Sequence, residues 1–338
     1  MRARWRRIAA LLSVFALTAS ATACSGSQDS DELLIYNAQH ESLTKEWIDA
    51  FTKETGIKVT YRQGGDTELG NQLVAEGKAS PADIFLTENS PAMAAVERAG
   101  LFADLDPETL NQVPPQYRPP DGKWTGVAAR TTVFVYNTAR LQPDQLPKSL
   151  LDLQQPQWKG RWGAPPTKAD FQAIVAALLQ LKGESATAQW LSAMKANAKL
   201  YSDNIATLKA VNAGEVDGGV IYHYYWFRDQ AKTKEMSGNT ALHYFKNQDP
   251  GAFVSLSGGG VLASTDKMDE AQQFIRFVTG KAGQEVLENG ASFEYPVASA
   301  VPANSALPPL NTLQAPNVNP SELDAQKVTD LMTKAGLL

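Results

Sequence analysis

The stretch Leu33-Leu34-Ile35-Tyr36-Asn37 is a short apolar run that ends at polar residues, which is typical of a buried strand. Helical and strand-like segments then alternate along the chain. The pattern predicts helices over 42–54, 67–77 and 91–99 and strands over 57–61 and 83–86. Strands separated by helices of about ten residues form βαβ units, so we expect an α/β fold with a mostly parallel sheet. Ligands of such sheets bind beyond the carboxyl ends of the strands, which here means residues 37–40 and 87–89.

The remaining pattern indicates a second lobe. With 338 residues, the chain is long enough for two domains, and two lobes leave a cleft between them. Prolines between residues 103 and 123 exclude long regular structure there, and a β-prone run over 131–136 could pass from one lobe to the other. Beyond it the sequence predicts helices over 171–182, 186–197 and 206–212, a strand over 216–221 and a returning β-prone run over 253–264.

The amino terminus has the features of an export signal. Residues 1–23 combine four arginines, an apolar run and a small-residue end, as a signal peptide does. The following Cys24 is the only cysteine, and Ala21-Thr22-Ala23-Cys24 resembles a bacterial lipobox, so we expect lipidation at Cys24 rather than a buried thiol. Residues 24–32 then form a polar tether, and the protein is expected outside the cytoplasm, lipid-anchored to the cell membrane.

The charge of the exported chain is negative. The formal net charge is -5, and removal of the four leader arginines with no acids makes it -5 - 4 = -9. Nucleic acid and anionic membrane surfaces are therefore poor partners, and contact with the membrane is expected only through the lipid anchor.

A cluster of aromatic donors stands out in the second half of the chain. Tyr222-His223-Tyr224-Tyr225-Trp226 places phenol oxygens and an imidazole in a small space. Hard oxygen donors suit a hard cation, of which ferric iron is an example. Adjacent tyrosines can also simply pack at the edge of a core. Both tyrosines can reach one ligand only if the chain turns after the strand, into a helix expected to begin near Trp226.

Several motifs resemble one family, the ferric-ion-binding proteins of bacterial ABC iron importers. The resemblance runs in order from about residue 33 to residue 338, including a closing helix over 331–338. The motifs that carry it are Tyr36-Asn37-Ala38-Gln39-His40, Ser80-Pro81-Ala82-Asp83-Ile84-Phe85, Glu88 with Pro91-Ala92, Tyr224-Tyr225-Trp226, Asp249-Pro250-Gly251-Ala252 and Glu294-Tyr295-Pro296.

The resemblance implies a ligand set for Fe(III): His40, Glu88, Tyr224 and Tyr225. Taken alone, His40 could be a hydrogen-bonded loop histidine and Glu88 a carboxylate at a helix start. Two phenolates and one carboxylate would neutralise a trivalent ion in a cleft that excludes water. Although a phenol has a pKa near 10, a bound cation makes the phenolate the stable form, so iron binding should release protons. His223 and His243 match no ligand position and are interpreted as structural.

The sequence departs from the family where a small anion is usually bound. The turn is Thr167-Lys168-Ala169-Asp170, and Tyr222 replaces one of two expected asparagines, while Asn204 remains. We expect a synergistic anion, carbonate or phosphate, held by Arg130 with Lys168 assisting. Carbonate is favoured over direct ligation by Asp170 or Tyr222, because a helix start attracts anions and the two cations outnumber the single acid.

These observations predict a two-lobed periplasmic-binding-protein fold (type II-like) whose hinge closes on Fe(III) and which delivers the ion to an ABC permease. The lobes are expected to be discontinuous, with 33–131 and 255–300 in lobe 1 and 132–254 and 301–338 in lobe 2. We expect a monomer without catalytic activity. One alternative is a protein of the same fold that binds an organic anion, such as a phosphonate or carboxylate, through Lys168 and Arg130. A non-haem iron enzyme usually needs two histidines and a carboxylate, and only one histidine lies in the predicted site.

Overall fold

The computed structural model describes residues 32–338, which form one compact unit. The predicted signal peptide, the lipidation site Cys24 and all of the tether except Glu32 lie outside the described residues. Among residues 32–338, no helix combines the length and apolar character that a membrane crossing requires.

The amino-terminal elements alternate as predicted. They are β1 (Leu33–Asn37), α1 (Glu41–Thr55), β2 (Val59–Gln63), α2 (Asp66–Glu76), β3 (Ile84–Leu86), α3 (Ser90–Arg98), α4 (Pro107–Gln112) and β4 (Thr125–Asn137). The helix α1 buries Leu43, Trp47 and Phe51 on one face and ends at Gly56, whose φ of 78° requires the left-handed conformation that glycine adopts easily.

The central and carboxyl-terminal elements follow. They are β5 (Trp162–Ala164), α5 (Ala169–Asn197), β6 (Ala198–Leu200), α6 (Asn204–Asn212), β7 (Gly218–Tyr222), α7 (His223–Gln230), β8 (Thr240–His243), β9 (Val254–Val261), α8 (Met268–Thr279), α9 (Lys281–Asn289) and α10 (Ala325–Lys334). The long helix α5 is kinked at Gly183, where two separate helices were predicted.

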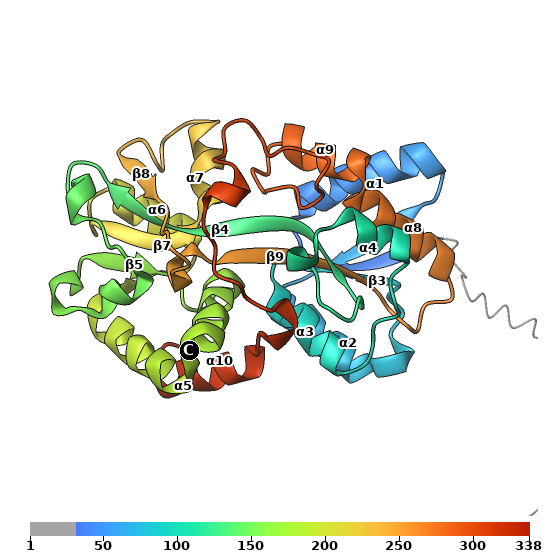
Figure 1. Ribbon diagram of the computed structural model, residues 1–338, viewed down its shortest axis with the longest axis horizontal. Coiled ribbons are helices and arrows are strands. Elements are labelled where there is room, and N and C mark those ends of the chain that lie inside the picture. Colours follow the sequence, from blue (N-terminus) through green and yellow to red (C-terminus); the bar gives the residue numbers. More distant parts are fainter. Residues whose placement is uncertain (1–31) are drawn as a thin grey trace, which may run out of the picture. The chain divides into compact units, whose positions relative to one another are not determined.

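The strands form a mixed sheet in the order β2-β1-β3-β9-β4-β7-β5-β6, with β8 paired to β4. Both ends of this order are parallel, as predicted: β1 pairs with β2 and β3, and β5 pairs with β6 and β7. The middle is antiparallel, because β9 returns beside β4. Figure 1 shows β4 and β9 running side by side between the two parallel groups, which makes them the connection between two halves.

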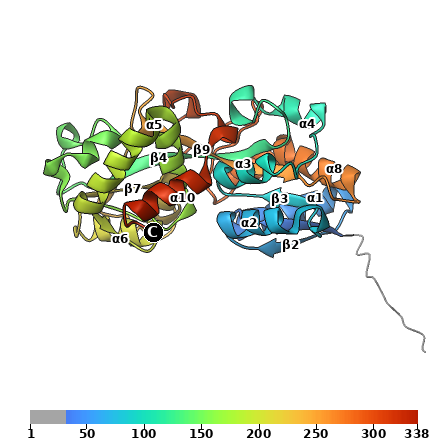
Figure 2. The same cartoon turned by 90° about the horizontal axis from the view of Figure 1, so that it is seen from below.

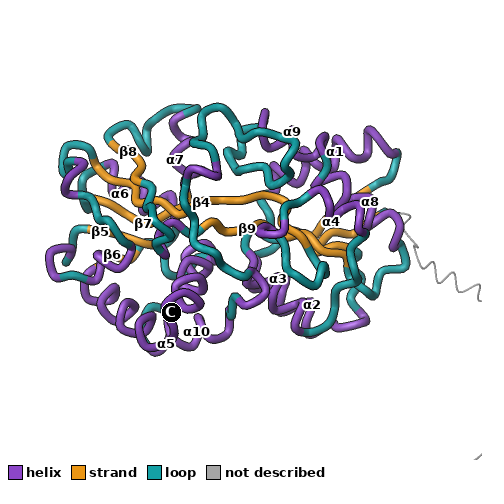
Figure 3. The backbone as a smooth tube through the Cα atoms, viewed as in Figure 1, coloured by secondary structure: helices purple, strands orange, loops and turns teal. Residues whose placement is uncertain are grey.

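Helices cover the sheet on both sides, as Figure 3 shows. One core packs Trp47 and Phe51 against Phe274 of α8, and another packs Trp162 and Trp190 with Phe171. The carboxyl-terminal helix α10 lies against α5 (Figure 2) and contributes Val328 and Met332 to the second core.

Several predicted boundaries were wrong; β4, for example, begins six residues before the predicted 131. The closing helix is Ala325–Lys334 rather than 331–338, because the Asp324 side chain accepts a hydrogen bond from the Lys327 amide at its start and Gly336, with a φ of 71°, follows its end. The helix that carries the tyrosines begins at His223, three residues before Trp226. Strand β2 lies two residues later than predicted.

Candidate metal centre

One pocket of about 560 Å³ lies where β1 and β3 end and where α1 and α7 begin. His40 follows β1 and immediately precedes α1, and Glu88 follows β3. Tyr224 and Tyr225 lie in the first turn of α7, and Tyr225 lines the pocket with His40 and Glu88. The structure therefore brings together the four side chains that the sequence predicted as iron ligands.

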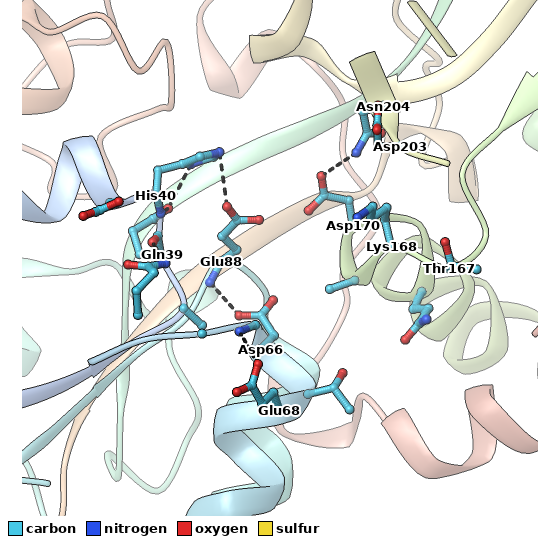
Figure 4. Close-up of a pocket in the computed structure, with 18 of the residues that line it drawn as sticks. Gln39, His40, Asp66, Glu68, Glu88, Thr167, Lys168, Asp170, Asp203 and Asn204 are labelled. Carbon is cyan, nitrogen blue, oxygen red and sulfur yellow. Dashed lines mark hydrogen bonds and ion pairs between the residues drawn. The ribbon is translucent and has the colours of Figure 1, made fainter. Parts of the chain in front are cut away.

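The first half of the molecule contributes an imidazole and a carboxylate that touch each other. His40 Nε2 lies 3.1 Å from Glu88 Oε1, and both side chains are about one-fifth exposed, at 19% and 21%. Figure 4 shows the pair at the pocket. Burial raises the pKa of Glu88 to about 8; Asp170 adds to the shift and His40 opposes it. Burial lowers the pKa of His40, but Glu88 and Glu294 outweigh burial and the net direction is upward.

The second half contributes two phenols that share one acceptor. The hydroxyls of Tyr224 and Tyr225 donate to Asp170 Oδ2 over 3.3 and 3.0 Å, and the two ring centroids are 4.2 Å apart. Consecutive residues on a strand would face opposite sides, whereas residues in one helical turn can face the same ligand. Burial, and after it Asp170, raises the pKa of both phenols well above the ordinary value, so both are protonated in the iron-free protein.

Asp170 is the centre of this second cluster. It lies in the first turn of α5, is 3% exposed, and also accepts hydrogen bonds from Asn204 Nδ2 at 2.9 Å and Asn89 Nδ2 at 3.1 Å. An ionised carboxylate is stabilised at a helix start by the free amides and the helix dipole. Four donors therefore hold one carboxylate group beside both phenol oxygens.

Asn89 links the two halves through a second carboxylate that the sequence did not reveal. Its amide nitrogen also donates to Asp66 Oδ2 at 3.0 Å, and the amide N–H of Glu88 donates to Asp66 Oδ1 at 2.9 Å. Burial raises the pKa of Asp66 to about 6, although Asn89 opposes the shift. The only advance signal was that Asp66 precedes a helix predicted to start at 67, which is a weak indication of a site.

Arg130 is already paired within the protein. Its Nη2 donates to Glu294 Oε2 at 2.7 Å and to Gln39 Oε1 at 2.9 Å, and all three side chains are buried. Burial lowers the pKa of Arg130, but Glu294 and then Glu88 outweigh burial and raise it, so the guanidinium stays charged. In the described part of the chain, its Nε and Nη1 have no hydrogen-bond partner. Lys168 lines the pocket just before α5.

The other aromatic and histidine side chains have partners of their own. The Tyr222 hydroxyl donates to Asn89 Oδ1 at 3.1 Å. His223 is buried, its Nδ1 accepts from the Thr131 amide at 3.3 Å, and burial lowers its pKa to about 3. His243 Nε2 lies 2.8 Å from the Pro147 carbonyl oxygen. These contacts agree with structural roles for both histidines.

As the side chains stand in residues 32–338, no group of three or more histidine, cysteine or acidic residues is arranged to hold a metal ion. A metal at this pocket would need phenol oxygens as well, and two of them lie beside Asp170. Carboxylate and phenolate oxygens are hard donors that match a small trivalent cation.

Comparison with known proteins agrees with this chemistry. A family model described as "bacterial extracellular solute-binding protein" matches residues 79–321. The chain is 61% identical over 331 residues to the Fe(3+)-binding periplasmic protein of Serratia marcescens, covering 98% of this chain and 97% of that one. It is 36% identical to the major ferric iron-binding protein of Neisseria meningitidis serogroup B, covering 90% and 93% of the two chains. This chain belongs to the bacterial extracellular solute-binding proteins.

The structure of this solute-binding protein is also similar to a solved one. Iron-bound HitA from Pseudomonas aeruginosa superposes with a TM-score of 0.84 at 41% identity, covering 90% of this chain and 99% of that chain. The predicted resemblance to ferric-ion-binding proteins and the predicted two-lobed α/β fold are therefore confirmed.

Proposed function

We propose that this protein captures Fe(III) outside the cytoplasm and delivers it to an ABC permease. The observation that carries the proposal is the convergence of two phenols on one buried carboxylate, opposite an imidazole and a second carboxylate. The names of the relatives from Serratia and Neisseria support the same cargo. No catalytic role is proposed for the site.

The proposed protein ligands are His40, Glu88, Tyr224 and Tyr225, with Asp170 as a fifth. Asp170 Oδ2 lies next to both phenol oxygens, so an ion bound to the two phenolates would be adjacent to it. This assignment gives Asp170 a position that was predicted for an anion. Two phenolates and two carboxylates already exceed the charge of Fe(III) by one, so a water molecule would complete the coordination at a lower electrostatic cost than an anion.

The sixth position is proposed for a small anion or a water molecule. The anion is supported by Nε and Nη1 of Arg130, two nitrogen donors that lack partners in the described chain, although Arg130 is not among the residues that line the pocket. Carbonate and phosphate both fit this description, with Lys168 at the pocket wall and Asn204 already bonded to Asp170. Tyr222 is a weaker candidate, because Asn89 accepts its hydroxyl hydrogen bond.

The charge of the pocket disfavours the organic-anion alternative. The pocket is lined by one lysine, Lys168, and by six acidic residues: Glu41, Asp66, Glu68, Glu88, Asp170 and Asp203. A phosphonate or carboxylate ligand without a metal would be repelled by the ionised members of this lining, and a cation would be attracted, even with Glu88 protonated near neutral pH.

We also propose that iron binding closes a hinge in β4 and β9. Along β4, residues Thr125–Thr131 pair with β9, and Thr132–Tyr136 pair with β7. This change of partner supports the proposed lobe boundary between 131 and 132. The packing of α10 on the second core supports placing 325–334 in lobe 2, whereas Leu307 and Leu313 pack with Val113 and Tyr295 of the proposed lobe 1.

Lipid anchoring at Cys24, after removal of residues 1–23, completes the proposal, with the protein acting as a monomer on the outer face of the membrane. Its support is the lipobox-like sequence alone. In a Cys24→Ser variant the protein should be released in soluble form or retain its leader. Recovery of this variant in the membrane fraction at the wild-type level, with its leader removed, would contradict lipidation.

The cargo is tested by titrating metal-free protein with Fe(III) and recording the visible spectrum. Phenolate coordination to Fe(III) produces a charge-transfer band, so the protein should become coloured at one equivalent of iron. A colourless protein that retains no iron after exchange into metal-free buffer would refute the proposed function.

A further inference from the structure

The imidazole of His40 is held on the side that faces away from Glu88. Its Nδ1 lies 3.1 Å from Gln39 Oε1 and 3.1 Å from Glu294 Oε1. Its Nε2 lies 3.1 Å from Glu88 Oε1, at the pocket. Which nitrogen carries the hydrogen therefore depends on whether the two oxygens near Nδ1 are acceptors.

The orientation of the Gln39 amide is fixed by its neighbours. Its nitrogen donates to Ser257 Oγ and to Glu294 Oε2, the latter at 3.3 Å. Its oxygen accepts from Arg130 Nη2 at 2.9 Å and from the His40 amide at 2.7 Å. Exchanging the two amide atoms would point an NH₂ group at two donors, so Oε1 must be the atom that faces Nδ1.

Glu294 is an ionised acceptor in a fixed place. It is fully buried, and Arg130 Nη2 donates to its Oε2 at 2.7 Å. The neighbouring Tyr295 exchanges two backbone hydrogen bonds of 2.9 Å with Ala129, which keeps the segment beside β4 and next to Arg130. Both oxygens near Nδ1 are therefore acceptors, so Nδ1 carries a hydrogen, and Nε2 is the nitrogen that can bind a metal once it gives up any proton shared with Glu88.

We propose that Glu294 is a positioning residue for iron: it holds the His40 ring with its hydrogen on Nδ1 and presents Nε2 to the ion. This proposal rests on the proposed function, because it assigns Glu294 a role in the same site. A carboxylate behind a metal-bound histidine fixes the ring orientation and makes the ligand more basic, and its loss typically weakens metal binding by about 10–100-fold.

Substitution by glutamine should break this arrangement without changing the size of the side chain. In Glu294→Gln, the new amide can turn its oxygen toward His40, and its NH₂ group then faces the donor Arg130. In the reverse orientation the NH₂ group faces His40, and Nδ1–H loses the acceptor at position 294. The matched control is Asp83→Asn, a buried carboxylate that contacts Lys267 and Thr265.

The test uses the full protein labelled with ¹⁵N-histidine and loaded with Ga(III), a diamagnetic trivalent ion. The chain has three histidines, so the His40 signals can be assigned by His40→Gln. We expect wild-type Nδ1 to be protonated with and without Ga(III), and only the Nε2 signal to shift on metal binding. Chelator competition should show about 10–100-fold weaker Fe(III) binding in Glu294→Gln and no such loss in Asp83→Asn.

Gallium bound through Nδ1, or an unprotonated Nδ1 in the wild type, would overturn the proposal even if Glu294→Gln failed to fold. So would a folded Glu294→Gln with unchanged His40 signals and unchanged iron affinity. Wild-type protein that binds neither Fe(III) nor Ga(III) would instead refute the proposed function, so the two failures can be distinguished.

Discussion

The two halves of the molecule offer the metal different kinds of ligand. The first half presents His40 and Glu88 on loops after strands, with side chains 19% and 21% exposed. The second half presents Tyr224 and Asp170 from first helical turns, 0% and 3% exposed, and already hydrogen-bonded to each other. The difference indicates that the second half holds a preformed cluster, which the more exposed pair of the first half already approaches, since the rings of His40 and Tyr224 have centroids 5.1 Å apart.

The largest effect is expected from the buried cluster. Tyr224→Phe and Tyr225→Phe each remove one anionic ligand without a change in ring size, so each should abolish or strongly shift the visible band. The iron affinity should fall by more than it does when a residue that hydrogen-bonds a metal ligand is lost, which is typically about 10–100-fold. Absorption spectroscopy and chelator competition measure both effects. If the colour and affinity of both variants matched the wild type, the phenols would not be ligands.

Asp170→Asn should have the next largest effect. Loss of one charged donor should weaken iron binding at least about tenfold, since even a charged hydrogen bond contributes about 1.5–3 kcal/mol. Added carbonate or phosphate should partly restore the band, because a vacant position becomes available to an anion. The control is wild-type protein stripped of both anions, which should still form the band. A wild-type band that needs carbonate would favour the anion over Asp170.

Glu88 should make the stability of the iron-free protein depend on pH. Burial raises its pKa from 4.5 to about 8, so between these values the folded state keeps a proton that the unfolded state has released. The stabilisation is fully present below about pH 4.5 and is lost as the pH rises through about 8. Asp66, with a pKa of about 6, acts in the same direction.

Calorimetry should therefore show a lower Tm at pH 8 than at pH 5.5 in iron-free protein, by about 2–4 °C for each kcal/mol lost. Glu88→Gln, which cannot ionise, should flatten this dependence. An equal pH dependence in the variant and the wild type would show that Glu88 is ionised throughout this range.

The smallest effect is expected from Lys168→Ala. Lys168 lines the pocket, but its amine makes no hydrogen bond or ion pair within residues 32–338. A solvated charge of this kind is worth at most about 1 kcal/mol, so iron affinity should change less than about fivefold. A much larger loss in competition assays would restore Lys168 as an anion clamp.

The sequence was informative where a residue's position follows from local pattern. His40 and Glu88 could be placed because each follows a short apolar strand, and the tyrosine pair because it follows β7. The three-residue strands β5 and β6 were missed, although the equally short β3 was predicted from its apolar run over 83–86.

The partners of the ligands could not be predicted from local pattern. Glu294 meets His40 across 254 positions of the chain, and Asn89 meets Asp170 across 81. The central place of Asp170 was also underestimated, because counting nearby charges does not show that Asn89, Asn204 and two phenols all donate to it. Arg130 was expected to face an anion, whereas the fold pairs it with Glu294.

The most direct test of the central claim is a crystal structure of the wild-type protein loaded with Fe(III), with diffraction recorded at the iron absorption edge. The account predicts one anomalous peak at metal–oxygen bonding distance, about 2 Å, from the hydroxyl oxygens of Tyr224 and Tyr225. The same peak should lie beside Asp170, Glu88 and Nε2 of His40. An iron peak elsewhere in the molecule, or one that contacts neither phenol oxygen, would contradict the account.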